Sequence, residues 1–514
     1  MTPHDLIASF GTLADAPDGI KRLRELVLQL AVRGKLVPQD AGDEPASKLL
    51  PKLARDVEDH VRQRHFRALQ RPEPLPQPDE RIDVPTGWEA VHLANVAGRR
   101  SGNSKLIKGQ QHDAAGPELF AGFSASGQDV WLDTFEHEGE AIIVSAVGAR
   151  CGKCFAANGR WSAIANTHIV WPYASVVYLP FLMLHVNDER FWSRSGGAQP
   201  FVKIEESFQS IIGLPPLAEQ HRIVAKVDEL MAFLDRLEAA RNARDATRTA
   251  LRDAALAALR DADGPDDVET AWGRIAGQMD DLFAEPADVG PLRQAVLQLA
   301  VRGRLVRQDV GDEPAKVRKV SEVASFLNGY AFKSEWYVAD GVRVLRNQNV
   351  GHGIARWDDT KRVSPAIAKE FERFALQTGD ITLSLDRPII TTGLKVAVVR
   401  EQDLPCLLLQ RVAKLEFRRD RMSPSYFYLW LNSPDFTGAI DPGRSNGVPH
   451  ISTREVERLT LLVPPLAEQH RIVAKVDELM GLLDKLEARL RDAKDLQGAF
   501  AAAAVHHLDV DVAA

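Results

Sequence analysis

The sequence predicts an α+β protein built from two similar halves in tandem. Three observations lead to this prediction: a seventeen-residue segment that occurs twice unchanged, a second repeat that opens each half, and two stretches between the repeats with short apolar runs bounded by turn residues. Such short runs are typical of mixed sheet-and-helix domains, and repetition of whole units indicates a repeat architecture. Since both halves carry the same parts in the same order, we expect a pseudo-twofold molecule.

The unchanged segment, PPLAEQHRIVAKVDELM, occupies residues 215–231 and 464–480. Its two prolines suit the start of a helix, because proline fixes φ and lacks the N–H that a first turn cannot use. Behind them, apolar residues recur at alternating steps of four and three, which places them along one narrow seam, as in a coiled coil. They are Ile223, Val227, Leu230, Leu234 and Leu237 in the first copy and Ile472, Val476, Leu479, Leu483, Leu486 and Leu490 in the second.

Seventeen identical residues at two places need a cause beyond core packing, since cores tolerate many apolar exchanges. We therefore predict that something outside each helix contacts the same surface twice. The predicted partner-docking residues are Glu219, Gln220 and Arg222 in the first copy and Glu468, Gln469 and Arg471 in the second. His221 and His470 are expected to belong to this docking surface rather than to a catalytic site, because no paired carboxylates accompany them.

The first long helix is expected to cover residues 217–261, because no helix breaker occurs before Gly264 and Pro265. About 45 residues at 1.5 Å each span roughly 65 Å, a length that suits a spacer. The second repeat, LRELVLQLAVRGKLVPQDAGDEPA at residues 23–46, returns with few changes at residues 292–315. Within it, Leu23, Val27, Leu30 and Ala31 lie on one helical face, and Gly34 is the expected C-cap.

These repeats divide the chain into five parts. The predicted parts are an N-terminal helical segment with a Pro-rich linker (1–84), a first mixed domain (85–214), a central region with the long helix and the second repeat (215–316), a second mixed domain (317–463) and a C-terminal coiled-coil helix (464–514). The two mixed domains share little sequence similarity, so they have diverged, whereas the repeated helical segments have not.

Composition places the chain among ordinary globular proteins. Its 514 residues suggest about three or four domains, with 45% hydrophobic and 26% charged residues. No apolar run approaches the roughly 20 residues that a membrane helix needs, and the N-terminus lacks the pattern of a secretion signal. Three cysteines, an odd number, favour a reducing cytoplasm. The net charge of −7 gives no global sign of nucleic-acid binding, which requires only a local basic surface.

The doubled segment entering a coiled-coil helix, together with LAVRGKLVPQD and GDEPA, resembles the specificity (S) subunit of type I restriction–modification enzymes across essentially the whole chain. This resemblance implies that each mixed domain is a target-recognition domain reading one half of a split DNA sequence. It also implies that the two long helices pair as an antiparallel coiled coil, set the gap between the half-sites and dock two methyltransferase (M) subunits. Restriction (R) subunits would join through the complex.

Candidate DNA contacts are polar stretches in the two mixed domains. Arginine and lysine suit phosphates and guanine edges, while asparagine and glutamine can pair with adenine. In the first domain the candidates are Arg99, Arg100, Asn103, Lys105, Lys108 and Gln110. In the second they are Arg343, Arg346, Asn347, Gln348, Asn349, Arg444, Ser445 and His450. Solvated loops without function are the alternative interpretation.

Catalytic signatures are not found in the sequence. The Pro-Pro pairs lie in Leu-Pro-Pro-Leu and Val-Pro-Pro-Leu, unlike the Asn/Asp-Pro-Pro-Tyr/Phe motif of adenine methyltransferases, and no GxxxxGK[ST] phosphate loop occurs. Cys151 and Cys154 form a single CxxC pair, for which a structural role is favoured over a metal site. We expect a non-catalytic subunit without metal or cofactor of its own; the resemblance places S-adenosylmethionine, ATP and magnesium on the partner subunits only.

Two other classes of function are open at this stage. One is an enzyme in which a methyltransferase and nuclease are fused to such a specificity region; the absent motifs and the lack of chain outside the repeats argue against it. The other is a coiled-coil scaffold without DNA binding, which leaves the two mixed domains unexplained.

Overall fold

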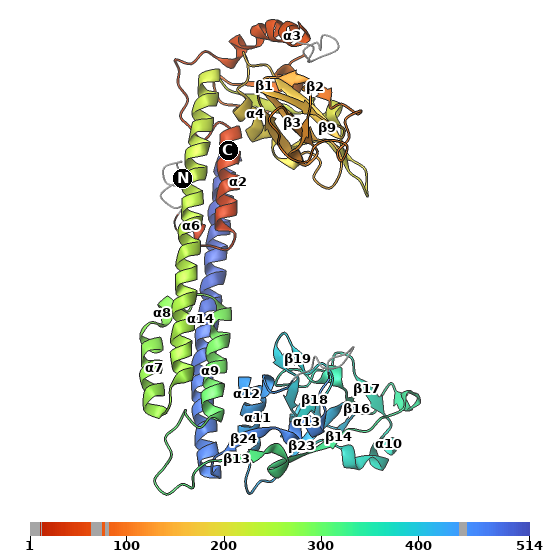
Figure 1. The fold of residues 1–514 in the computed structure, drawn as a ribbon, viewed down its shortest axis with the longest axis vertical. Helices are drawn as coiled ribbons and strands as arrows, with labels where there is room; N and C mark the ends of the chain where they lie inside the picture. The colour runs from red at the N-terminus through yellow and green to blue at the C-terminus, as the bar shows by residue number, and fades with distance from the viewer. Residues whose placement is uncertain (1–10, 12, 63–73, 78–81, 441–449, 514) are drawn as a thin grey trace. The chain divides into compact units, whose positions relative to one another are not determined.

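The computed structural model describes residues 11–513 apart from 12, 63–73, 78–81 and 441–449. The chain divides into two compact units, one of Met1–Asn242 with Leu496–Ala514 and the other of Ala243–Asp495. Each unit combines one domain of strands and short helices with parts of two long helices (Figure 1). The prediction of an α+β fold with two mixed domains and long helices is therefore confirmed.

The domain of the first unit contains two four-stranded sheets. One is antiparallel in the order β2-β9-β6-β7; the other has the order β4-β3-β8-β5, with β3 and β8 parallel. A separate antiparallel pair, β1 with β12, brings the two ends of the domain together. The strands are β1 Glu89–His92, β2 Ala97–Ser101, β3 Phe120–Ser124, β4 Gly127–Leu132, β5 His137–Glu138, β6 Ala141–Ser145, β7 Cys154–Ala157, β8 Arg160–Ala163, β9 Thr167–Pro172, β10 Arg194–Ser195, β11 Phe201–Val202 and β12 Ile211–Leu214. The helices are α4 Leu179–Val186 and α5 Ile204–Ser207.

The domain of the second unit has a similar plan, with a different edge strand in its second sheet. Its sheets have the orders β14-β23-β18-β21 and β15-β17-β16-β22, with β16 and β22 parallel, and β13 pairs with β24 at the domain ends. The strands are β13 Lys316–Lys319, β14 Ala324–Asn328, β15 Tyr337–Val338, β16 Val342–Leu345, β17 Lys361–Val363, β18 Ile381–Ser384, β19 Ile389–Ile390, β20 Gly393–Leu394, β21 Val396–Val398, β22 Cys406–Leu408, β23 Val412–Phe417 and β24 Thr460–Val463. The helices are α10 Pro365–Glu370, α11 Pro424–Asn432, α12 Pro434–Thr437 and α13 Thr453–Arg458.

Two pairs of single bridges mark equivalent places in the two domains. The parallel bridge between Asn103 and Ile164, just after β2 and β8, corresponds to the bridge between Tyr330 and Leu409, just after β14 and β22. Likewise, the antiparallel bridge of Val147 to Phe201 corresponds to that of Asp386 to His450. Positions can therefore be compared between two domains whose sequences have diverged.

The second repeat forms a short helix in each unit, α2 Gly19–Val32 and α9 Val289–Val301. Both end on a glycine in the left-handed region, Gly34 and Gly303, each with φ 68°. In the first unit the N–H of Lys35 then donates to the carbonyl of Leu30 at 2.9 Å, as in a Schellman cap. The predicted C-cap at Gly34 is confirmed. Three further helices lie beside these in the sequence: α3 Leu53–Arg62 follows α2, and α7 Pro265–Gly277 and α8 Met279–Leu282 precede α9.

The two long helices are α6 Leu217–Asp261, with the predicted limits, and α14 Leu466–Ala513. Their predicted apolar seams are buried: Ile223, Val227, Leu230 and Leu234 pack in one cluster with α2. In the second unit, Ile472, Val476, Leu479, Leu483 and Leu486 pack with α9. None of the helices within the described residues combines the length and apolar character that a membrane crossing requires.

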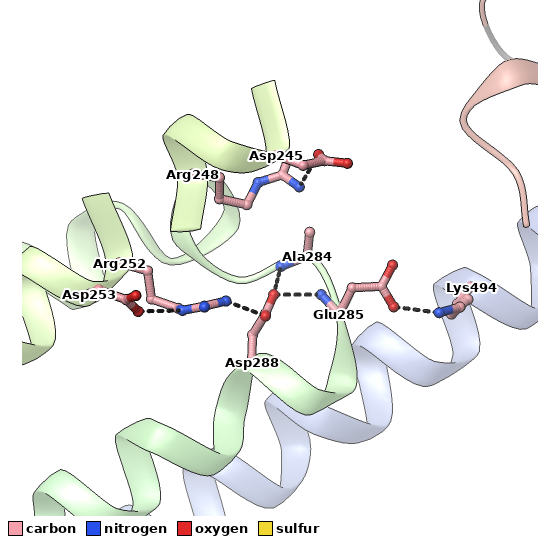
Figure 2. Close-up of polar contacts among 8 residues, drawn as sticks. All are labelled: Asp245, Arg248, Arg252, Asp253, Ala284, Glu285, Asp288 and Lys494. Atoms are coloured by element: carbon pink, nitrogen blue, oxygen red, sulfur yellow. Dashed lines mark hydrogen bonds and ion pairs between the residues drawn. The ribbon is translucent and has the colours of Figure 1, made fainter. Parts of the chain in front are cut away.

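Polar contacts in the second unit tie the end of α6 to α14 through residues 284–288 (Figure 2). Arg252 of α6 pairs with Asp288, whose Oδ2 also accepts from the N–H groups of Ala284 and Glu285, at 3.0 and 2.9 Å. Glu285 in turn pairs with Lys494 of α14. Farther along α6, Leu259 lines a cavity together with Leu479 of α14. From the first of these places to the second, residue numbers rise along α6, from 252 to 259, and fall along α14, from 494 to 479, so the two helices are antiparallel in this unit.

Candidate functional site

In each unit, a buried glutamine of the repeated segment forms hydrogen bonds with the mixed domain. Gln220 Oε1 accepts from the N–H of Tyr178 at 2.7 Å, while Nε2 donates to the carbonyls of Val176 and Pro215, both at 3.0 Å. The side chain is fully buried. One polar side chain thus joins the start of α6 to the residues that lead into α4.

Gln469 makes the same set of bonds in the second unit. Its Oε1 accepts from the N–H of Ser423 at 2.8 Å, and Nε2 donates to the carbonyls of Arg421 and Pro464 at 2.9 and 2.8 Å. Tyr178 and Ser423 are the N-cap residues of α4 and α11, so the two sites are equivalent. The unit of repetition therefore includes the domain–helix junction.

The two sequence repeats contact each other through ion pairs. Arg222 donates to both carboxylate oxygens of Asp43, at 3.1 and 2.7 Å, and Asp43 belongs to the GDEPA motif of the second repeat. In the other unit, Arg471 pairs with Asp312 at 2.6 Å and with Asp309 at 2.7 Å. The hydrogen-bonded guanidinium of Arg222 lowers the pKa of Asp43, as that of Arg471 lowers the pKa of Asp312. This explains why both motifs recur together.

Glu219 and Glu468 are buried beside these ion pairs, with exposed fractions of 1% and 3%. Glu219 Oε1 and Glu468 Oε2 have no hydrogen bond of ordinary geometry within the described parts of the chain. Loss of hydration raises the pKa of both carboxyl groups, although the nearby Trp88 indole opposes the shift at Glu219 and Arg471 opposes it at Glu468. Both units therefore hold an acidic side chain in an unfavourable setting.

We expect that replacing Glu219 and Glu468 by glutamine stabilises the chain more at pH 8 than at pH 5. The folded-state pKa lies above the unfolded one, so the wild type loses stability as the pH rises from the unfolded value through the folded value. Glutamine does not titrate, so the stability of the variant relative to the wild type should increase with pH between the unfolded and the folded pKa of the glutamates. Denaturant unfolding at several pH values measures this gain. The exposed pair Glu229→Gln and Glu478→Gln is the control, and an equal gain at both pH values would contradict the expectation.

The docking prediction needs correction at four residues. Glu219, Gln220, Glu468 and Gln469 lie inside their units, where a partner cannot reach them. The sequence carried a signal of this: Gln220, Ile223 and Val227 continue the three-and-four spacing of the apolar seam backwards, so Gln220 lies on the buried face. Arg222 and Arg471 remain partly exposed beside their aspartates.

Other residues of the repeated segment are exposed in both copies. In the first they are Ala218, His221, Ala225, Asp228 and Glu229, and in the second Ala467, His470, Ala474, Asp477 and Glu478. Steps of three or four, with one adjacent pair at the end of each set, place them along one outward stripe of the helix. We call these ten residues the shared stripe. Beyond Met231 the two copies differ at 232, 233 and 236, which correspond to 481, 482 and 485, and all of these are at least partly exposed.

The DNA candidates of the first domain lie on β2 and in the following loop. The Nε of Arg99 donates to Glu205 of α5 at 3.0 Å, and its guanidinium lies 4.8 Å from the centre of the Phe208 ring. Asn103 donates to Glu136 at 2.6 Å, and Lys108 pairs with Asp129. The other candidates of this domain, Arg100, Lys105 and Gln110, are half-buried in the first case and exposed in the other two.

In the second domain Arg343 lies on β16 and Arg346, Asn347, Gln348 and Asn349 follow it, and several of these side chains bond within the domain. Arg343 donates to the carbonyls of Gln402 and Leu404, at 2.8 and 2.7 Å. Asn349 is only 2% exposed, and its amide donates to the carbonyls of Arg356 and Asp359. The prediction that Asn349 contacts DNA is therefore wrong, because its donors are already used inside the domain.

The remaining candidates of that domain differ in access. Arg346 pairs with Asp359 at 2.9 Å and is 14% exposed, while Gln348 is exposed and donates to the same carboxylate at 2.8 Å. Asn347 is half-buried, and His450 is exposed. The predictions at Arg444 and Ser445 lie outside the described residues. The strand equivalent to β16 is β3, not β2, so the two candidate stretches occupy different places in the two domains.

Comparison with known proteins identifies the family. A family model described as the type I restriction modification DNA specificity domain matches residues 312–493. The specificity subunit of the type I restriction enzyme EcoAI from Escherichia coli is 35% identical, over 93% of this chain and 92% of its own length. This chain belongs to the specificity subunits of type I restriction enzymes.

Two further proteins are similar to this chain. The EcoEI specificity subunit from Escherichia coli is 25% identical over the same shares, 93% of this chain and 92% of its own. A crystal structure of the HsdS subunit from Thermoanaerobacter tengcongensis aligns with 81% of this chain and 96% of its own at a TM-score of 0.42 and 19% identity. Specificity subunits of this family are DNA-recognition subunits and are not catalytic themselves.

The cysteines of this specificity subunit are packing residues. Cys151, Cys154 and Cys406 are buried and free. Burial raises the pKa of the Cys154 and Cys406 thiols to about 12, so neither forms a thiolate readily near neutral pH. Within the described residues, no cluster of three histidine, cysteine or acidic side chains could hold a metal ion.

Proposed function

We propose that this specificity subunit reads a split DNA target, one half with each mixed domain, and that it docks one methyltransferase subunit on each copy of the repeated segment. The observation that carries the proposal is the contrast within each unit. The two domains share a topology but not a sequence, while the segments that hold them are identical. Two readers with separate targets and two docking sites for one partner would produce this contrast.

The shared stripe supports the docking part of the proposal. Its ten residues are exposed and identical in the two copies, and exposed positions of a helix tolerate substitution more readily than buried ones. The copies begin to differ at exposed positions directly after Met231 and Met480. A partner that contacts both helix starts would constrain these residues and leave the later ones free. Restriction subunits would then join through the docked methyltransferases, and S-adenosylmethionine, ATP and magnesium would bind to those partners only.

The DNA part of the proposal is supported by the exposed polar residues of each domain. Lys105, Gln110, Gln348 and His450 remain accessible, and arginine or lysine side chains such as Arg99 and Lys108 could exchange an internal carboxylate for a phosphate. Such a subunit would act on cytoplasmic DNA.

The decisive experiment is methylome sequencing of a host with and without this gene. We expect a methylated adenine motif in two halves, separated by a fixed gap, that disappears when the gene is deleted. An unchanged methylome in a host with intact partner genes would contradict the proposal. If complexes assemble but bind DNA without sequence preference, the chain is a scaffold rather than a reader.

The purified specificity subunit alone is expected to transfer no methyl group and to cut no DNA. The reason is that the catalytic residues would belong to its partners. Incubation with labelled S-adenosylmethionine and host DNA measures transfer, and addition of the methyltransferase subunits should restore it. Transfer by the lone chain would show that the subunit carries an active site.

A further inference from the structure

The two buried glutamines, Gln220 and Gln469, hydrogen-bond to backbone groups of the recognition domains. Gln220 binds the backbone of Val176 and Tyr178, and Gln469 binds that of Arg421 and Ser423. These residues differ completely between the two domains, yet the hydrogen bonds are the same. A contact made to the backbone survives divergence of the side chains, so one helix start can hold many different domains.

The chemistry of the junction fits glutamine alone among side chains of this length. The site offers one N–H donor and two carbonyl acceptors, and the amide supplies one acceptor and two donors. A glutamate would face two carbonyl oxygens with an acceptor-only group. An apolar side chain would leave three buried backbone groups unpaired, which is costly for each of them. Identity at Gln220 and Gln469 therefore has a local cause that the shared stripe does not have.

We infer that Gln220 and Gln469 are positioning residues that hold each recognition domain at a fixed angle to its own long helix, and that this rigidity makes the subunit selective for the gap in its DNA target. The inference rests on the proposed split target. The bonds to Val176 and Tyr178, or to Arg421 and Ser423, fix the residues that lead into α4 or α11 against the first turn of α6 or α14, so rotation of a domain about its helix would break both of them.

The DNA duplex explains why rigidity would matter. Each base pair added to the gap moves one half-site by about 3.4 Å and turns it by roughly 34°, because B-DNA completes a turn in 10–10.5 base pairs. A domain that can swing on its helix follows such a change, whereas a fixed domain cannot. Loosening one junction should relax the requirement for the gap without changing which bases either half-site contains.

The test measures methylation by the assembled complex on DNA duplexes that differ only in the gap, by one base pair more or fewer. We expect the wild type to prefer its own gap by about tenfold or more, a discrimination of ~1.4 kcal/mol. Gln220→Met and Gln469→Met should each reduce this preference to about threefold or less, with the half-site sequences unchanged. Methionine keeps the length of the side chain and removes its hydrogen bonds.

A matched control separates positioning from general stability. Val170→Ala removes apolar volume from β9 at a fully buried residue that makes none of the junction hydrogen bonds, and it should keep the wild-type preference although it destabilises the first domain. The inference would be overturned if Val170→Ala reduced the preference for the native gap as much as Gln220→Met does. It would also be overturned if a folded Gln220→Met complex kept the wild-type preference for that gap.

A second variant covers failure of the methionine variants to fold. Ser423 has φ −77° and ψ 127°, values that proline adopts, so Ser423→Pro removes the single donor to Gln469 Oε1 with little other change. This variant should also reduce the preference for the native gap, and a complex that keeps the wild-type preference would contradict the inference. A wild type that methylates all gaps equally would instead refute the split target itself, and the inference with it.

Discussion

Exchanging residues 85–214 for the corresponding domain of a relative with another target should replace one half of the methylated motif and leave the other half unchanged. The exchanged segment contains one complete domain, because β1 and β12 pair at its ends. Its attachment to α6 depends on backbone atoms near Val176 and Tyr178, which a domain of the same topology also supplies. We expect a complete switch of one half-site, read by methylome sequencing.

The reciprocal exchange of residues 317–463 is the matched control. It should change the other half-site only, because β13 and β24 close that domain in the same way. The gap should persist in both chimeras if the junctions hold the inserted domains at the native angle. A motif that changes in both halves after a single exchange would show that the two domains do not read independently.

Sequence periodicity was enough to predict the helical elements. The limits of α6, the buried seam and the cap at Gly34 all depend on residues close together in the chain, where proline, glycine and apolar spacing act directly. The mixed domains were predicted as such from short apolar runs. Their strand order was not, because pairing such as β2 with β9 joins residues about 70 positions apart, and no local pattern encodes it.

The candidate sites were predicted less well, for a physical reason. A polar residue is read from the sequence as exposed, yet Gln220 and Asn349 are buried because backbone groups satisfy their amides. The partner of Arg222 could not be predicted either. Asp43 lies 179 residues away in another repeat, and only the folded unit brings the two motifs together. Identity between copies thus had two causes, internal bonds and an exposed stripe, that the sequence alone did not separate.

Placing an arginine at Ala225 and at Ala474 should abolish assembly with the methyltransferase subunits. Both alanines are exposed on the shared stripe, and arginine is nearly as good a helix former as alanine, so the fold should persist. The large charged side chain would stand where a docked partner must approach closely. Each single variant should lose one of two methyltransferases, with that contact weakened by about 30-fold or more, the effect of a central interface residue. Mass measurement of the purified complex counts the bound subunits.

Ala239→Arg with Ala488→Arg is the matched control for this double variant. These alanines are exposed on the same two helices, eight residues beyond the repeated segment, and occupy equivalent positions in the two copies. They add the same charge and volume where no docking is proposed, so two methyltransferases should remain bound. If the control weakens assembly as much as the stripe variant, docking depends on the helices in general. If the stripe variant still binds two methyltransferases, the exposed identity between the copies has no role in docking, and the partner must contact another surface.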